Sequence, residues 1–152
     1  MKAKIARIYL AAFPLWLWAS ASRAETALVT PQEAMLPPYP VLTQRGPVTG
    51  PKVELTGPPG DVAGGTPFAL AAVFKPRAAT RIDPTSVHII LLRGNGIDVT
   101  EQVRAAGRID QSGIDLTGLV APPGDYTIRV TVSDTMQQTG FADFTLKIDA
   151  PR

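Results

Sequence analysis

The feature that most constrains the fold is a run of strict alternation near the C-terminus, in residues 126–133. Its apolar and polar residues alternate one by one, in the order Tyr126, Thr127, Ile128, Arg129, Val130, Thr131, Val132 and Ser133. Successive side chains of a β-strand point to opposite faces of the sheet. The run therefore predicts a strand that buries one face and leaves the other in water.

Six further short runs have the composition of strands. They occupy residues 53–55, 68–74, 85–93, 97–100, 114–116 and 142–148. Turn residues separate them, and the whole chain contains 15 Pro and 13 Gly, which favours short strands over long helices. About seven short strands at this spacing predict an all-β antiparallel sandwich in residues 52–149.

Three local features add detail to this prediction. The run at 68–74 is apolar on both of its faces, which suggests that it is covered on both sides. Asn95 and Gly96 predict a tight turn, because an Asn-Gly pair readily takes positive φ. Residues 100–106 are the one candidate for a helical turn, with Thr100 as its cap and Gly107 at its end.

Residues 1–24 have the pattern of a secretory signal peptide. Lys2, Lys4 and Arg7 precede an apolar run of 14 residues at 8–21, which is too short to span a bilayer as a helix. The small residues at 19–21 and at 22–24 both suit cleavage, after Ala21 or after Ala24, and we expect it after Ala24. An uncleaved membrane anchor is the alternative. The product is then periplasmic or secreted, with no membrane span left after cleavage.

Removal of this segment changes the charge of the protein. It holds four of the 15 Lys and Arg residues and none of the 13 Asp and Glu residues, so the mature chain has a net charge of −2. This balance argues against a nucleic-acid partner. The absence of cysteine excludes disulfides and thiolate metal sites, and a single histidine excludes any site that needs two imidazoles.

Residues 25–51 form a proline-rich extension with six prolines. Because proline fixes φ and lacks an N–H donor, we expect polyproline II or disorder here, with no regular element. Leu36, Tyr39 and Val41 make its middle apolar. The segment either packs on its own domain, lies loose, or serves as a docking arm for a partner. Residues 150–152 are a short C-terminal tail.

The segment from Leu119 to Asp134 combines a leucine, a Pro/Gly turn, Tyr126 and the alternating run. This pattern resembles the penultimate strand of bacterial immunoglobulin-like and fibronectin type III-like domains. The resemblance implies an Ig-like β-sandwich in which Tyr126 forms a tyrosine corner, with its hydroxyl bonded to a backbone group just upstream. Leu119 and Gly124 would then be structural residues of that corner.

The same region, together with Thr139–Phe144, is also similar to the end of the CopC-type periplasmic copper carriers. Those proteins use an N-terminal histidine and a second histidine just after the position of Asp134. Here Thr135 and Met136 follow Asp134. The resemblance therefore implies kinship in fold without the copper site, because the imidazoles that Cu(II) prefers are missing.

The remaining polar residues give weak signals for chemistry. His88 lies in an apolar strand on the face of Ile90 and Leu92, where a structural role is favoured over a ligand or general base. Asp98 and Glu101 form a carboxylate pair, but tying down a turn is the simpler role for Asp98. We expect no catalytic, metal or cofactor residue.

Acidic and thioether side chains elsewhere in the chain are candidates for metal binding. Acidic residues that mark turns or strand ends, and so suit Ca²⁺ only weakly, are Asp110, Asp115, Asp125 and Asp134. Met35 and Met136 offer thioethers for Cu(I), but they lie far apart in the sequence. The sequence thus predicts a non-enzymatic exported interaction module with an envelope or periplasmic protein partner. The alternative is a periplasmic carrier of copper, calcium or a small ligand.

Overall fold

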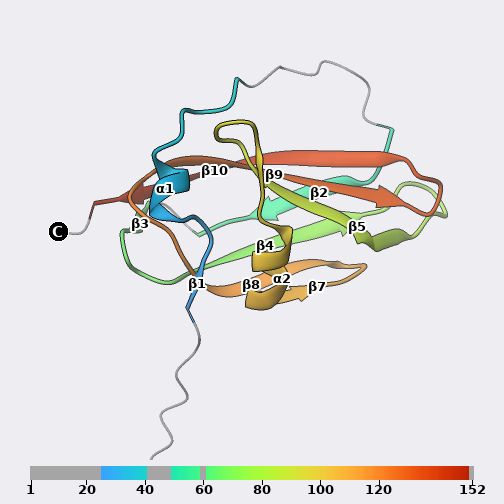
Figure 1. Cartoon of the computed structure of the whole chain (residues 1–152). Coiled ribbons are helices and arrows are strands. Elements are labelled where there is room, and N and C mark those ends of the chain that lie inside the picture. Colours follow the sequence, from blue (N-terminus) through green and yellow to red (C-terminus); the bar gives the residue numbers. More distant parts are fainter. Residues whose placement is uncertain (1–24, 41–48, 59–60, 151–152) are drawn as a thin grey trace, which may run out of the picture.

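The alternating runs form strands that stack into two facing sheets (Figure 1). This computed structural model describes residues 25–40, 49–58 and 61–150. The predicted signal peptide, its cleavage site and the end of the C-terminal tail lie outside the described residues. In the described part, no helix is long and apolar enough to cross a membrane.

Each of the two sheets contains five strands. The first sheet consists of β1 (Thr26–Ala27), β8 (Gly113–Val120), β4 (Phe68–Lys75) and β2 (Lys52–Thr56), with β7 (Gly107–Ile109) also paired to β8. The second sheet consists of β3 (Val62–Ala63), β10 (Thr139–Asp149), β9 (Gly124–Asp134), β5 (Ile82–Leu91) and β6 (Ile97–Asp98). This arrangement confirms the predicted all-β Ig-like sandwich.

All the long strand pairs are antiparallel, as expected. β9 and β10 form a hairpin along their whole length, from the pair Ser133–Thr139 to the pair Gly124–Ile148. Two short pairs, β1 with β8 and β3 with β10, are parallel, which the sequence did not predict. The described residues contain ten strands rather than about seven, because β1, β3 and β7 have only two or three residues each.

The core fills the space between the sheets. The alternation of β9 works as predicted, because Tyr126, Ile128, Val130 and Val132 are all buried. Facing them from the first sheet are the inward side chains of β4 and β8, which include Phe68, Leu70, Phe74, Ile114 and Leu116. The outer side of β4 is open instead of covered, since Val73 is 47% exposed, so the apolar character of both faces did not indicate full burial.

β5 begins earlier than its sequence signal and ends at Leu91. It starts at Ile82 and passes through Pro84, where its pairing with β9 shifts register between Asp83 and His88. The Ser86 side chain fills this gap: its hydroxyl accepts a hydrogen bond from the Ser133 amide at 2.8 Å. A proline in a paired strand is tolerated at such a bulge because no ladder bond is required of its nitrogen.

The prediction that no regular element forms in residues 25–51 is wrong for its first part. β1 pairs with β8, and α1 (Pro31–Ala34) follows directly. Thr30 and Glu33 form a capping box, and Pro31 occupies the first helical position, where a missing N–H costs nothing. The sandwich therefore begins before Lys52.

Two local assignments also need correction. α2 (Thr100–Ala106) forms and ends at Gly107 as predicted, but its N-cap is Val99, without a side-chain bond. The Thr100 hydroxyl instead accepts from the Ile89 amide at 2.9 Å, which joins α2 to β5. In the turn after β5, positive φ occurs at Gly94 and Gly96 and not at Asn95.

Candidate functional site

The best-defined polar arrangement in the described structure centres on Arg93, two residues after the end of β5. Its Nη1 donates hydrogen bonds to the carbonyl oxygens of Ala34 and Leu36, both at 2.8 Å. Its Nη2 donates to the carbonyl oxygen of Asp125 at 2.6 Å. One half-buried guanidinium thus fastens the end of α1 to the start of β9.

Tyr126 lies directly beneath this contact. Its hydroxyl donates to the carbonyl oxygen of Pro122 at 2.8 Å, and its side chain is buried. This is the geometry of a tyrosine corner. The Arg93 guanidinium carbon lies 4.9 Å from the centre of the ring, within cation–π range. Burial raises the pKa of the Tyr126 phenol, and the charge of Arg93 opposes part of this rise.

The other two residues expected at this corner lie around the tyrosine. Leu119 is fully buried in β8. Gly124 has a φ of +149° and would place a Cβ 3.3 Å from the Tyr126 hydroxyl oxygen. A side chain there would therefore be strained by its backbone and crowded against the corner.

The proline-rich segment continues along the residues that follow β5. The Gly94 amide donates to the carbonyl oxygen of Pro37 at 2.8 Å, and the Tyr39 amide donates to that of Leu92 at 3.1 Å. At its other end, Leu28 and Val29 are buried in the core. We call residues 25–40 the arm; it packs on its own domain rather than lying loose.

The arm leaves apolar side chains in water. Met35 is 88% exposed and Leu36 is 39% exposed, while Tyr39 is half-buried. Leu36 also lies over Gly94, where an added Cβ would meet its Cδ1 at 3.2 Å. Val41, the third expected partner-binding residue, lies outside the described residues. Met35 and Leu36 are thus presented on a backbone that Arg93 holds in place.

Sequence reasoning missed Arg93. Its partners are carbonyl oxygens 57 and 59 residues away along the arm and 32 residues away at Asp125. Backbone acceptors leave no residue-type signature, so no local pattern identifies the contact. The capping box from Thr30 to Glu33, with proline between them, was the available signal that this region is ordered.

His88 points outward on the face of Ile90, but Leu92 is buried, because the alternation ends with β5 at Leu91. His88 Nδ1 lies 3.4 Å from Asp98 Oδ2, an exposed contact. The Asp98 Oδ1 accepts from the Thr100 amide at 2.9 Å. Burial acts to raise the pKa of Asp98, but the hydrogen bonds from Thr100 and His88 outweigh it, so the pKa is lowered.

The carboxylates considered for catalysis or metal binding have separate partners. Glu101 lies 3.6 Å from Arg104 on α2, while Asp98 ties down the turn before that helix. Asp134 is buried; its Oδ1 accepts from the amides of Met136 and Gln138 at 2.9 and 3.0 Å. Its Oδ2 is buried without a hydrogen-bond partner among the described atoms.

No set of three or more His, Cys, Asp or Glu residues in the described ranges is grouped to hold a metal ion. Asp110 instead organises the β7–β8 hairpin: its Oδ1 accepts from the amides of Ser112 and Gly113 at 2.8 and 3.2 Å. The similarity to CopC-type carriers is not supported.

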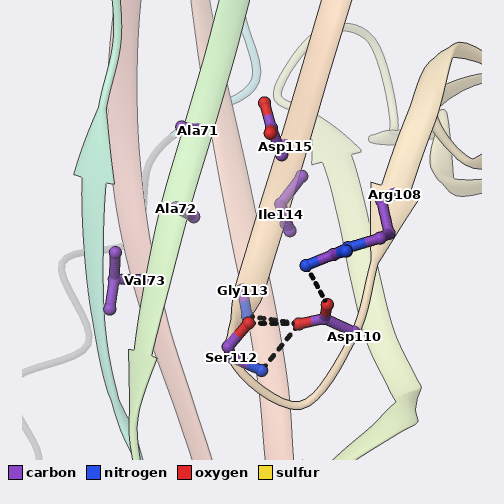
Figure 2. Close-up of a pocket in the computed structure, with 9 residues that line it drawn as sticks. All are labelled: Ala71, Ala72, Val73, Arg108, Asp110, Ser112, Gly113, Ile114 and Asp115. Carbon is purple, nitrogen blue, oxygen red and sulfur yellow. Dashed lines mark hydrogen bonds and ion pairs between the residues drawn. The ribbon is translucent and has the colours of Figure 1, made fainter.

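A shallow depression of about 390 Å³ lies beside this hairpin, on the outer side of the first sheet (Figure 2). Figure 2 shows Arg108 reaching back toward Asp110, with which it forms an ion pair at 2.8 Å. Asp115 sits opposite Arg108 in the strand register. Two carboxylates and one guanidinium leave this depression without an excess of positive charge.

The solved structures to which this chain is similar include a peptidase domain and a murine protein. The PKD domain of an M14-like peptidase from the Thermoplasmatales archaeon SCGC AB-540-F20 is 14% identical, with coverage of 66% of this chain and 96% of that chain and a TM-score of 0.44. Murine CRIg is 11% identical, with coverage of 66% and 99% and a TM-score of 0.41. No family model and no curated protein matches the chain.

The class of the protein follows from its own geometry. Two facing sheets of short strands, the β9–β10 hairpin in the second sheet and the buried Tyr126 corner together define an immunoglobulin-like β-sandwich. Such a fold indicates where contacts are made and does not by itself define an activity.

Proposed function

We propose that this chain is a non-catalytic, exported interaction module that binds another protein through the arm. The observation that carries the proposal is the exposure of Met35 and Leu36 on a backbone fixed by the three hydrogen bonds of Arg93. Apolar side chains exposed on a pre-ordered segment favour binding, because part of the ordering entropy has already been lost before the partner arrives.

The chemistry of the arm suggests the kind of partner. Methionine is flexible and polarisable, so Met35 fits irregular apolar surfaces. Pro37 and Pro38 keep the chain after it extended. The partner surface is therefore an apolar groove on an envelope or periplasmic protein.

Export is the second part of the proposal. It is supported by the basic start and the short apolar run of residues 1–24. N-terminal sequencing of the protein isolated from its host tests this part directly. A first residue of Glu25 is the expected result, and an intact Met1 would overturn it.

Site-specific crosslinking tests the binding surface. A photoreactive amino acid replaces Met35 in the protein expressed at its natural level in its own host. The matched control carries the same group at Met136, which is 68% exposed in the β9–β10 loop. We expect one discrete adduct from position 35 and none from position 136.

Equal adducts from both positions, or none from position 35, would overturn the assignment of the arm. The competing carrier function is tested on the same preparation by elemental analysis. If the protein isolated at its natural level contains one equivalent of copper or calcium, the carrier function is supported and the proposed function is overturned.

A further inference from the structure

A groove of about 550 Å³, separate from the depression in Figure 2, lies where one edge of the first sheet meets the second sheet. Its walls include Pro51, Lys52, Lys75, Pro76, Arg77 and Phe141. Lys52 and Lys75 are direct neighbours across β2 and β4. Phe141 belongs to β10, so the groove is assembled from both sheets. We call it the basic groove.

The basic groove carries more positive charge than its surroundings neutralise. Glu54 accepts from both lysines: Lys52 Nζ lies 2.8 Å from Oε1 and Lys75 Nζ lies 2.6 Å from Oε2. Hydrogen bonds from Lys52 and Lys75 lower the pKa of Glu54 to about 2, so it stays ionised at neutral pH. One carboxylate therefore balances only one of the two ammonium groups.

Arg77 adds a third cation. No carboxylate of the described residues lies within ion-pair distance of its guanidinium. Lys52, Lys75 and Arg77 thus carry three positive charges, and Glu54, their one ion-pair partner among the described residues, carries one negative charge, which leaves an excess of two. Glu54 also holds Lys52 and Lys75 in position. An anionic group that enters meets cations that are accessible and already oriented.

The walls between these cations are apolar and fixed. Phe141 is half-buried, and the Arg129 guanidinium carbon lies 4.8 Å from its ring centre. Arg129 is itself held by Asp143 through two bonds of 2.7 and 2.8 Å. Pro51 and Pro76 add rigid apolar surface. This surface suits an uncharged side chain placed next to the anionic group.

Next to the groove, the backbone of Pro51 is in close contact with the backbone of Gly140. A Cβ on Gly140 would overlap the carbonyl oxygen of Pro51, so the start of β2 and the start of β10 touch without side chains between them. A concave apolar site that is already formed and carries a few placed polar groups is typical of ligand-binding clefts.

We infer that the basic groove binds a short acidic segment of a partner protein, in which a carboxylate side chain stands next to an apolar one. The carboxylate meets Lys52, Lys75 and Arg77, and the apolar side chain packs on Phe141 and the prolines. This site is independent of the arm. The depression in Figure 2 is the natural contrast, since Asp110 and Asp115 outnumber Arg108 there.

Nuclear magnetic resonance tests the inference on ¹⁵N-labelled protein purified after export. The probes are the acetylated and amidated peptide Glu-Leu-Glu-Leu, its matched form Gln-Leu-Gln-Leu, and inorganic phosphate. We expect the Glu peptide to shift the amides of Lys52, Lys75, Arg77 and Phe141 saturably. The Gln peptide and phosphate, at the same concentration, leave these amides in place.

Two variants locate the effect. Arg77→Ala is expected to weaken binding of the Glu peptide about fivefold, the value of one solvent-accessible ion pair. Arg108→Ala, in the depression of Figure 2, is the matched control and leaves binding unchanged. Amides away from residue 77 report that each variant remains folded.

Four results would overturn the inference. Shifts of equal size from the Gln peptide would mean that the groove binds the peptides through apolar contacts alone. Shifts of equal size from phosphate would mean that it holds any anion. No shift from the Glu peptide, or undiminished binding by Arg77→Ala, would show that the groove is not the binding site.

Discussion

Replacing Arg93 by alanine tests the contact that fixes the arm. The substitution removes three hydrogen bonds to backbone carbonyls and one cation–π contact with Tyr126. Each bond contributes about 1 kcal/mol where the carbonyl can be rehydrated after the change, and the cation–π contact adds about 0.5 kcal/mol. The expected loss is therefore about 3.5 kcal/mol, a large part of the ~5–15 kcal/mol that stabilises a domain.

The loss should appear first as release of the arm. Leu28 and Val29 are buried and hold the start of the arm, so the part set free is the stretch after α1. The amides of Tyr39 and Gly94 bond across this contact, and hydrogen exchange measures their protection. A loss of about 3.5 kcal/mol speeds their exchange roughly 300-fold, since each 1.4 kcal/mol is a factor of ten.

Two variants make the result specific. Arg93→Lys keeps the charge, but one ammonium cannot span carbonyls on the arm and on β9 together, so an intermediate loss is expected. Arg108→Ala removes a 77% exposed arginine with one ion pair, and should cost less than about 1 kcal/mol. If Arg93→Ala unfolds in urea within about 0.5 kcal/mol of the wild type and both amides keep their protection, the reasoning is refuted.

Three further outcomes follow from single side chains. Tyr126→Phe should lower the free energy of unfolding in urea by about 1 kcal/mol, because it removes only the hydroxyl hydrogen bond of the corner. The carboxyl of Glu54 should titrate by NMR near pH 2, and a titration midpoint near 4.5 would contradict its bridging position between two lysines. Because folding lowers its pKa, the stability that Glu54 contributes is complete above its ordinary pKa of 4.5 and is lost as the pH falls toward 2. Gly140→Ala should cost about 1–3 kcal/mol by the same urea assay, since the new Cβ forces β10 away from the first sheet, and an unchanged midpoint would show that the strands do not touch there.

The long strands were predictable because burial imposes a period of two on them. In residues 126–133 of β9 every inward residue is apolar and every outward residue is polar, and the structure buries this inward set completely. The same logic located β2, β4, β8 and β10. It wrongly predicted that both faces of β4 are buried, because Val73 is apolar but faces outward and is exposed. The apolar character of a strand face does not show whether another element covers that face.

Two of the two-residue strands, β1 and β3, were not predictable. β1 and β3 have two residues each, and each pairs in parallel with the end of a long strand. A two-residue strand carries no period, and its pairing depends on which part of a distant strand has a free edge. Such contacts follow from the packed sandwich and leave no trace in the local sequence.

The arm shows the limit of reasoning from composition. Its proline content argues against regular structure, yet Pro31 begins α1, and the remaining prolines of the arm allow the extended path along Leu92 and Gly94. Proline excludes interior helix and central strand positions and leaves helix starts and edges open. What decided the outcome was Arg93, whose acceptors are backbone atoms and so have no sequence signature.

The arm contact and the basic groove lie at different points of the same hairpin. Arg93 bonds to Asp125 at the start of β9, while Phe141 pairs with Thr131 near its end. Six residues of strand separate Asp125 from Thr131, on the order of 20 Å. Changes at such separations are additive when they share no partner. Arg93→Ala should therefore leave the groove's affinity for the Glu peptide unchanged. A partner that binds both surfaces would gain affinity because the two sites are linked on one rigid hairpin, with no new contact required.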